Sequence, residues 1–210
     1  TGNQLTVSAA GIYRVTATNE YGCSTTAADS LIVIALPIPT ISGNTTVCRG
    51  NSTTLTADGG MVYQWSTGYT GRECTVTPNT NTQYTVTAYN QYGCSAASSA
   101  TVTVKALPTV SFLGENTFCD GSSTTITAQG ASMFLWSTGA NTSSITVDVP
   151  GTYYVQATNA SNCTKVDSFT VTRLNNPVVS ISGDNLVCES SPHILTASGA
   201  GTYQWSTGEN

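Results

Sequence analysis

One tryptophan phrase recurs three times along the chain. Trp65, Trp136 and Trp205 each stand in an aromatic-x-Trp-Ser-Thr-Gly phrase, and their spacings are 71 and 69 residues. Self-similarity at a fixed period is the sequence signature of a repeat architecture, in which every unit is one supersecondary structure. The chain is therefore predicted to be a tandem array.

The period also predicts where each unit begins and ends. Residues 38–107 and 108–176 are expected to be complete repeats. Residues 1–37 read as the C-terminal half of a repeat, and residues 177–210 as the N-terminal half of another. We interpret the sequence as a stretch of a longer array, whose half-repeats are completed by flanking sequence or by a neighbouring copy.

Alternation of apolar and polar residues predicts strands throughout, with no helical periodicity. Tyr63 and Trp65 share one face of their strand, and Tyr84, Val86 and Ala88 form an inward row on a later strand. We expect the core aromatic residues to be Trp65, Trp136, Trp205, Tyr13, Tyr84 and Tyr153.

A tryptophan on the third strand and a Tyr-x-Val row on the penultimate strand are typical of an immunoglobulin-like sandwich. Only about 11 residues separate Trp65 from Val76, so strands of a full immunoglobulin domain are expected to be missing. The predicted fold class is all-β, a tandem array of short immunoglobulin-like β-sandwich domains.

Composition excludes two classes of partner. Charged residues make up 8% of the chain, and 6 Lys and Arg stand against 11 Asp and Glu, which leaves no basic patch for nucleic acid. The longest apolar run, residues 31–36, is followed by Pro37 and is far shorter than the roughly 20 residues that span a bilayer. We expect neither nucleic-acid binding nor membrane insertion.

The cysteines follow the repeat. Six of the seven fall into two periodic series, which are Cys23, Cys94 and Cys163, and Cys48, Cys119 and Cys188. Single repeated cysteines without Cys-x-x-Cys spacing favour disulfides, and hence an extracellular location, over buried cytosolic thiols.

Two disulfide patterns fit these positions. The favoured pattern pairs cysteines within a repeat, Cys48 with Cys94 and Cys119 with Cys163. The alternative joins Cys48 to Cys163 across a domain junction. The favoured pattern leaves Cys23 and Cys188, which are expected to pair outside this sequence.

The seventh cysteine is not periodic. Cys74 stands where the other repeats have Leu5 and Ile145, so it is predicted to be a buried free thiol that packs as a small apolar residue. A bond to another chain is the alternative.

Catalytic chemistry has little support. The only histidine, His193, replaces Thr53 and Thr124 at a solvent-facing strand position, so no base is available for a serine or cysteine nucleophile. Acidic residues occur singly, without a calcium-loop pattern, although a calcium site at a domain junction stays open. We expect no enzyme activity, no cofactor and no metal site.

Three stretches resemble a known class of repeats. They are Thr-Thr-Val-Cys-Arg-Gly-Asn-Ser-Thr-Thr-Leu-Thr-Ala at 45–57, Tyr-Gln-Trp-Ser-Thr-Gly at 63–68 and Gln-Tyr-Thr-Val-Thr-Ala-Tyr-Asn-Gln-Tyr-Gly-Cys at 83–94. They are similar to the Ig-like and PKD-like repeats of large surface adhesins and filaments exported by the type IX pathway of Bacteroidota, including gliding-associated adhesins. The resemblance implies a stalk or filament attached to the cell surface or secreted.

The expected function is thus a structural repeat segment that gives length, stiffness and assembly at the cell surface. Its expected partners are flanking repeats, copies of itself in a homo-oligomeric filament, and another cell surface. Leu135 and Ile194 are the interface candidates, because each replaces a polar residue on an outward face. The alternative function is a glycan- or protein-binding module, which requires an exposed aromatic platform.

Overall fold

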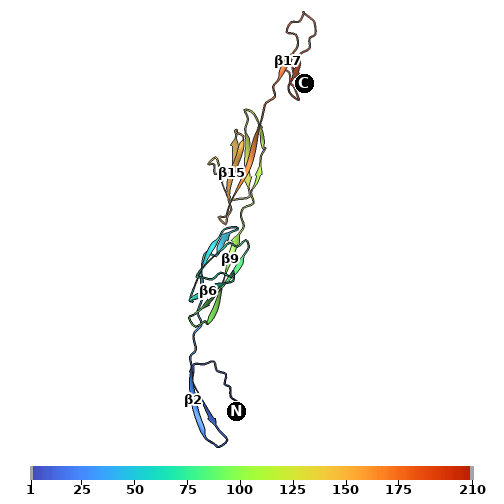
Figure 1. The fold of residues 1–210 in the computed structure, drawn as a ribbon. Coiled ribbons are helices and arrows are strands. Elements are labelled where there is room, and N and C mark those ends of the chain that lie inside the picture. Colours follow the sequence, from blue (N-terminus) through green and yellow to red (C-terminus); the bar gives the residue numbers. More distant parts are fainter. Residues whose placement is uncertain (1, 209–210) are drawn as a thin grey trace. The chain divides into compact units, whose positions relative to one another are not determined.

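The computed structural model describes residues 2–208, so residue 1 and residues 209–210 of the two predicted half-repeats lie outside the description. Every regular element in the described range is a β-strand. The chain divides into two compact units, Thr1–Ala106 and Leu107–Asn210 (Figure 1).

The strands of the first unit are β1 Gly11–Thr18, β2 Ser24–Leu31, β3 Thr40–Gly43, β4 Thr46–Cys48, β5 Thr53–Asp58, β6 Val62–Trp65, β7 Glu73–Val76, β8 Thr82–Tyr89 and β9 Ser95–Lys105. Those of the second unit are β10 Ser111–Leu113, β11 Thr117–Cys119, β12 Thr124–Gln129, β13 Met133–Trp136, β14 Ser144–Val147, β15 Gly151–Thr158, β16 Thr164–Leu174, β17 Ser180–Ser182 and β18 Thr196–Ser198.

Each unit contains one two-layer sandwich with the same strand order. In the first unit a three-stranded sheet, β3-β5-β7, faces a four-stranded sheet, β4-β9-β8-β6, and the second unit repeats this as β10-β12-β14 and β11-β16-β15-β13. The chain passes from β6 directly to β7 in the opposite sheet, without the intervening strands of larger immunoglobulin domains. The prediction of short immunoglobulin-like sandwiches is confirmed.

A glycine between β3 and β4 lets the chain change from one sheet of the first sandwich to the other. The chain pairs with β5 through β3 and then with β9 through β4, and the change follows Gly43. Gly43 has φ of 128°, and a Cβ built there would lie 2.5 Å from the carbonyl oxygen of Thr54. Glycine is therefore required by both conformation and space.

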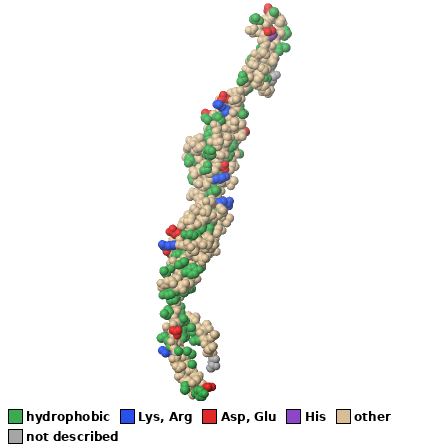
Figure 2. Space-filling view, in the orientation of Figure 1, with side chains coloured by type: hydrophobic (Ala, Val, Ile, Leu, Met, Phe, Trp, Pro, Cys, Tyr) green, Lys and Arg blue, Asp and Glu red, His purple; other side chains and the backbone are tan. Residues whose placement is uncertain are grey.

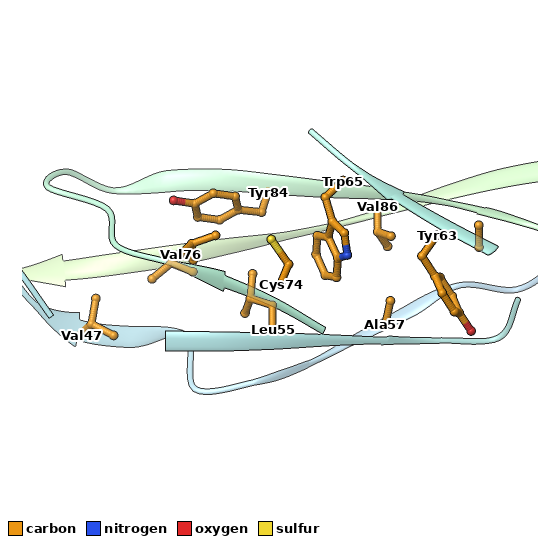
Figure 3. Close-up of a cluster of buried hydrophobic side chains, with 11 residues drawn as sticks. Val47, Leu55, Ala57, Tyr63, Trp65, Cys74, Val76, Tyr84 and Val86 are labelled. Atoms are coloured by element: carbon orange, nitrogen blue, oxygen red, sulfur yellow. The ribbon is translucent and has the colours of Figure 1, made fainter. Parts of the chain in front are cut away.

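The tryptophan closes the core between the two sheets. Trp65 is 2% exposed and packs with Leu55 from β5 and Val86 from β8 (Figure 3). Its indole Nε1 donates a hydrogen bond to the carbonyl oxygen of Gly71 at 2.9 Å. Burial therefore leaves no unsatisfied indole donor.

The second sandwich is built in the same way. Trp136 is buried, and its Nε1 donates to the carbonyl oxygen of Thr142 at 2.9 Å. Tyr153 is half-buried, and its hydroxyl donates to the carbonyl oxygen of Val149 at 2.7 Å. A tyrosine early in the penultimate strand that bonds backbone upstream is the tyrosine corner of immunoglobulin-like sandwiches.

Apolar residues stand where antibody domains carry their inter-sheet disulfide. The second cysteine of such domains lies two residues after the corner tyrosine, and here the residue after Tyr153 at that spacing is Val155, whose equivalent in the first sandwich is Val86. Val86 and Leu55, on opposite sheets, are both fully buried in the core of the first unit. Apolar packing thus replaces the cross-sheet bond.

The two predicted half-repeats are less buried than the complete sandwiches. Strands β1 and β2 form a hairpin equivalent to β8 and β9, yet Val15 is 65% exposed whereas the equivalent Val86 is 0% exposed. The expected core residues Tyr13 and Trp205 are only half-buried. In the first sandwich, the strands of the facing sheet cover Tyr84 and Trp65. Among the described residues, neither half-repeat has such a facing sheet, so its side chains are less buried.

Candidate functional site: sandwich ends and outer faces

The two periodic cysteines of a sandwich lie at its opposite ends. Cys48 is the last residue of β4 and pairs with Lys105, the last residue of β9. Cys94 immediately precedes Ser95, the first residue of the same strand. Because β9 is 11 residues long, about 35 Å separates its ends.

The second sandwich repeats this arrangement. Cys119 pairs with Leu174 at the end of β16, and Cys163 immediately precedes Thr164 at its start. A disulfide requires a Cα separation of at most about 7 Å. Neither sandwich can therefore join its own two periodic cysteines.

The structure corrects the favoured disulfide pattern. Cys94 and Cys119 are free thiols, so the expected pairs Cys48 with Cys94 and Cys119 with Cys163 are not formed. Cys48 and Cys163 are the two cysteines that are each engaged in a disulfide. The prediction relied on the shortness of the segment after Trp65 and did not account for the length of β9, along which the two positions are separated.

The remaining cysteines are free thiols in two environments. Cys23 and Cys188 are exposed. Cys74 is buried, on β7 between the sheets, with its Sγ 3.6 Å from the hydroxyl of Thr67 (Figure 3). Cys74 is thus a buried free thiol, as the sequence predicted.

An asparagine holds each cysteine turn in shape. The side-chain oxygen of Asn90 accepts hydrogen bonds from the backbone N–H groups of Tyr92 and Cys94, both at 3.0 Å. Asn159 accepts in the same way from Cys163, at 3.1 Å. These bonds fix the backbone that presents the sulfur, as in an Asx-turn.

The same turn also binds the incoming chain. The side-chain nitrogen of Asn90 donates to the carbonyl oxygen of Ala35 at 2.9 Å. Ala35 precedes Pro37 and leads into the first sandwich. The turn that carries Cys94 therefore lies at the end where the chain enters this sandwich, and Cys48 lies at the end where the chain leaves it.

An apolar patch covers part of the outer face of the second sandwich. Leu135, 50% exposed, pairs with Gln156, which in turn pairs with Val166. Around Leu135 the exposed apolar side chains on this face are Met133, Leu135, Tyr154 and Val166, which we call the outer patch. The equivalent positions of the first sandwich are Val62, Gln64, Thr85 and Ala97, which are more polar.

Neither unit gathers its other candidate residues into one site. Ile194 is 80% exposed in a segment without strand structure, and His193 beside it is exposed. The exposed tyrosines Tyr69 and Tyr92 follow the C-terminal ends of β6 and β8, which are antiparallel. These tyrosines therefore do not form one aromatic platform on the first sandwich.

Charges are sparse and exposed. Figure 2 shows acidic and basic side chains as isolated groups on an uncharged surface, and Arg72 with Asp58 is one of the exposed ion pairs. A hydrogen bond from Lys165, at 3.0 Å, and one from the Ser168 N–H lower the pKa of Asp167. The exposed pair of Arg72 and Asp58 contributes little to stability, whereas Lys165 and Asp167 are partly buried.

Within residues 2–208, no group of three or more His, Cys, Asp or Glu side chains is arranged to hold a metal ion. No helical segment in that range has the length and apolarity needed to cross a membrane.

Comparison with known proteins finds similar structures but no family. No family model matches the chain, and no curated protein matches it. Murine CEACAM1b is 13% identical over 65% of this chain and 100% of that chain, with a TM-score of 0.31. A Ca2+-stabilised adhesin that helps an Antarctic bacterium bind ice is 13% identical over 82% of this chain and 59% of that chain, with a TM-score of 0.34. At these values the fold assignment rests on the strand order described above.

Proposed function

We propose that this chain is a load-bearing segment of an extracellular stalk or filament, in which each sandwich contributes length and resists extension. The observation that carries this proposal is the parallel pairing of β4, the second strand of the first sandwich, with β9, its last strand. The second sandwich pairs β11 with β16 in the same way.

The pairing geometry explains why this arrangement suits a stalk. When the disulfides are reduced, tension on the two ends of the sandwich acts on β4 from its N-terminal side and on β9 from its C-terminal side. Because the two strands are parallel, they are pulled in opposite directions along their shared axis. Backbone bonds at both edges of the pair, from Arg49 N–H to Lys105 O at 2.9 Å and from Thr103 N–H to Thr45 O at 2.8 Å, are then loaded together. Shared loading requires several bonds to break at once before the strands separate.

The proposal includes a cell-surface setting. The resemblance of residues 45–57, 63–68 and 83–94 to repeats of type IX-exported adhesins favours export to the surface of a Bacteroidota cell, with gliding-associated adhesins among the candidates. Periodic cysteines favour the same oxidising exterior. Adhesion to a target is assigned to other parts of such a polypeptide.

Removing one bond of the β4–β9 pair tests the mechanical proposal. Arg49→Pro eliminates the N–H that donates to Lys105, and we expect forced unfolding of the first sandwich to be about five to ten times faster, in line with the loss of about 1 kcal/mol. Force spectroscopy of the reduced chain, pulled by its termini, measures the rate. Arg49→Ala keeps the N–H and should match the unchanged chain.

Equal unfolding rates for the proline and alanine variants would show that this pair does not carry the load. The mechanical proposal would then be withdrawn. Specific glycan or protein binding by the folded chain, at the tyrosines or elsewhere, would favour the binding-module alternative.

Lateral assembly is proposed to use the outer patch. Leu135→Asp places a charge at its centre, so we expect the concentration needed for filament formation to rise about tenfold or more. Light scattering and electron microscopy measure assembly, and circular dichroism checks that the half-exposed position tolerates the change. Gln64→Asp, at the equivalent position of the first sandwich, is the control. Unaltered assembly of the Leu135 variant would exclude the patch.

A further inference from the structure

Strand β14 is an open edge of the second sandwich. It is the last strand of its three-stranded sheet, and among the described strands its only partner is β12. Ala128 N–H donates to the carbonyl oxygen of Ser143 at 2.8 Å, which makes these residues a hydrogen-bonded pair. Such pairs alternate with non-hydrogen-bonded pairs in an antiparallel ladder. The backbone N–H and C=O groups of Ser144 and Thr146 therefore point away from β12, toward the open edge.

No charged side chain protects this edge along residues 141–147. The equivalent edge of the first sandwich is β7. There Ala57 N–H donates to the carbonyl oxygen of Arg72 at 2.8 Å, so the same alternation turns the backbone of Glu73 toward the open edge. Glu73 occupies the position of Ser144. Because a charge on an edge strand opposes pairing with another chain, the first sandwich has a protected edge and the second has an unprotected one.

The β14 edge is continuous with the outer patch. A groove beside the patch is lined by Met133 and Leu135, which belong to it, and by Asn141 and Ser143, which lead into β14. The patch, the groove and the edge thus form one surface of the second sandwich. The outer patch is assigned above to contact with another copy of this chain, so a second copy is the occupant that this continuity favours for the edge.

We propose that β14 pairs antiparallel with β14 of a second copy, so that two three-stranded sheets join into one sheet of six strands. A two-fold axis at Ile145 places Ser144 of each copy opposite Thr146 of the other. Each such pair exchanges two backbone hydrogen bonds across the axis. The charge that follows β14, Asp148, then lies opposite Thr142, so like charges do not meet. The pairing extends the lateral assembly proposed above and rests on that part of the proposed function.

The side chains along the edge are compatible with this pairing. The Thr146 and Ser144 hydroxyls are bonded within the sheet, to the hydroxyls of Thr125 at 3.0 Å and Thr127 at 2.8 Å. The hydroxyl of Thr142 donates to the carbonyl oxygen of Ser144 at 2.6 Å. A carbonyl oxygen has two lone pairs, so the Ser144 oxygen can also accept the N–H of Thr146 from the second copy.

Amide hydrogen exchange tests the pairing directly. In concentrated, assembled protein the amides of Ser144 and Thr146 should exchange at least about tenfold more slowly than in dilute monomer, because pairing protects them. The amides of Glu73 and Thr75, on the protected edge, should exchange at the same rate in both samples. NMR resolves the individual amides, and the exposed thiols are alkylated beforehand so that no disulfide joins two chains.

A proline variant tests the same contact by its strength. Thr146→Pro removes the N–H at the open edge of each copy and leaves the bonds to β12, so the dissociation constant of the pair should rise about thirtyfold. Thr75→Pro is the matched control, because it loses the equivalent hydroxyl bond, from Thr54 to Thr75 at 2.9 Å, and should not change the dissociation constant. Thr146→Val keeps the N–H and should match the unchanged chain. Analytical ultracentrifugation measures association, and circular dichroism checks folding.

The results separate the edge pairing from the proposed function. Equal dissociation constants for the Thr146→Pro and Thr75→Pro variants, or Ser144 and Thr146 amides that stay unprotected in assembled protein, would overturn the pairing. If Leu135→Asp weakened assembly while those amides were unprotected, the outer patch would stand and the edge pairing alone would be withdrawn. The load-bearing proposal is tested by forced unfolding of the Arg49→Pro variant and depends on neither result.

Discussion

Trp65→Ala should remove most of the stability of the first sandwich while the second sandwich stays folded. The indole is almost fully buried and also satisfies the Gly71 carbonyl. Truncating a buried tryptophan costs about 3–5 kcal/mol, against a total of about 5–15 kcal/mol for a typical domain. The expected result is a thermal transition for the first unit that is well separated from that of the second.

Hydrogen exchange read by mass spectrometry locates the effect. Amides of β5 and β8 should lose protection, whereas those of β12 and β15 should keep theirs, because each sandwich has its own core. Gln64→Ala, on the exposed face of the same strand, is the control and should change neither sandwich. Equal loss of protection in both units would show that their folding is coupled, contrary to the division into separate cores.

Gly43→Ala should destabilise the first sandwich by about 2–3 kcal/mol. The new Cβ must occupy a backbone conformation that side chains rarely adopt and would lie 2.5 Å from the Thr54 carbonyl oxygen. A shift of β3 or β5 that relieves this contact disturbs the pairing between these two strands. Chemical denaturation, followed by tryptophan fluorescence, measures the change.

Gly68→Ala separates the two causes. Gly68 has φ of 85°, with open space around the position of a Cβ, so alanine there adds backbone strain without the steric conflict. We expect about 1 kcal/mol for this control. Equal destabilisation of the two variants would show that the close approach of Gly43 to the Thr54 carbonyl oxygen has no effect on stability. The change of sheets would then require glycine only for its backbone conformation.

Much of the sandwich could be predicted from the residues themselves. Period-two alternation placed Tyr63, Trp65, Tyr84 and Val86 on inward faces, because neighbouring side chains of a strand point to opposite sides. The substitution of Cys74 at a position of aliphatic residues in the other repeats likewise indicated burial. These inferences need only local geometry.

The disulfide pattern required information that alternation does not contain. Cysteines of one repeat are close in sequence order, but β9 separates Cys94 from the end where β4 places Cys48. The sequence also did not predict that the chain changes sheets between β3 and β4, after Gly43. A glycine alone does not reveal which sheet the following residues join. Both features depend on strand direction and partner choice, which are set by tertiary packing.

The packing of Leu55 against Val86, described above, separates folding from oxidation. The disulfide of an antibody domain lies in its core, so reduction destabilises the domain itself. Here the core of the first sandwich contains no disulfide, because its single cysteine, Cys74, is a free thiol, so the core forms without an electron acceptor. The first sandwich can therefore complete its core before any thiol is oxidised, and a reductant added later leaves that core intact.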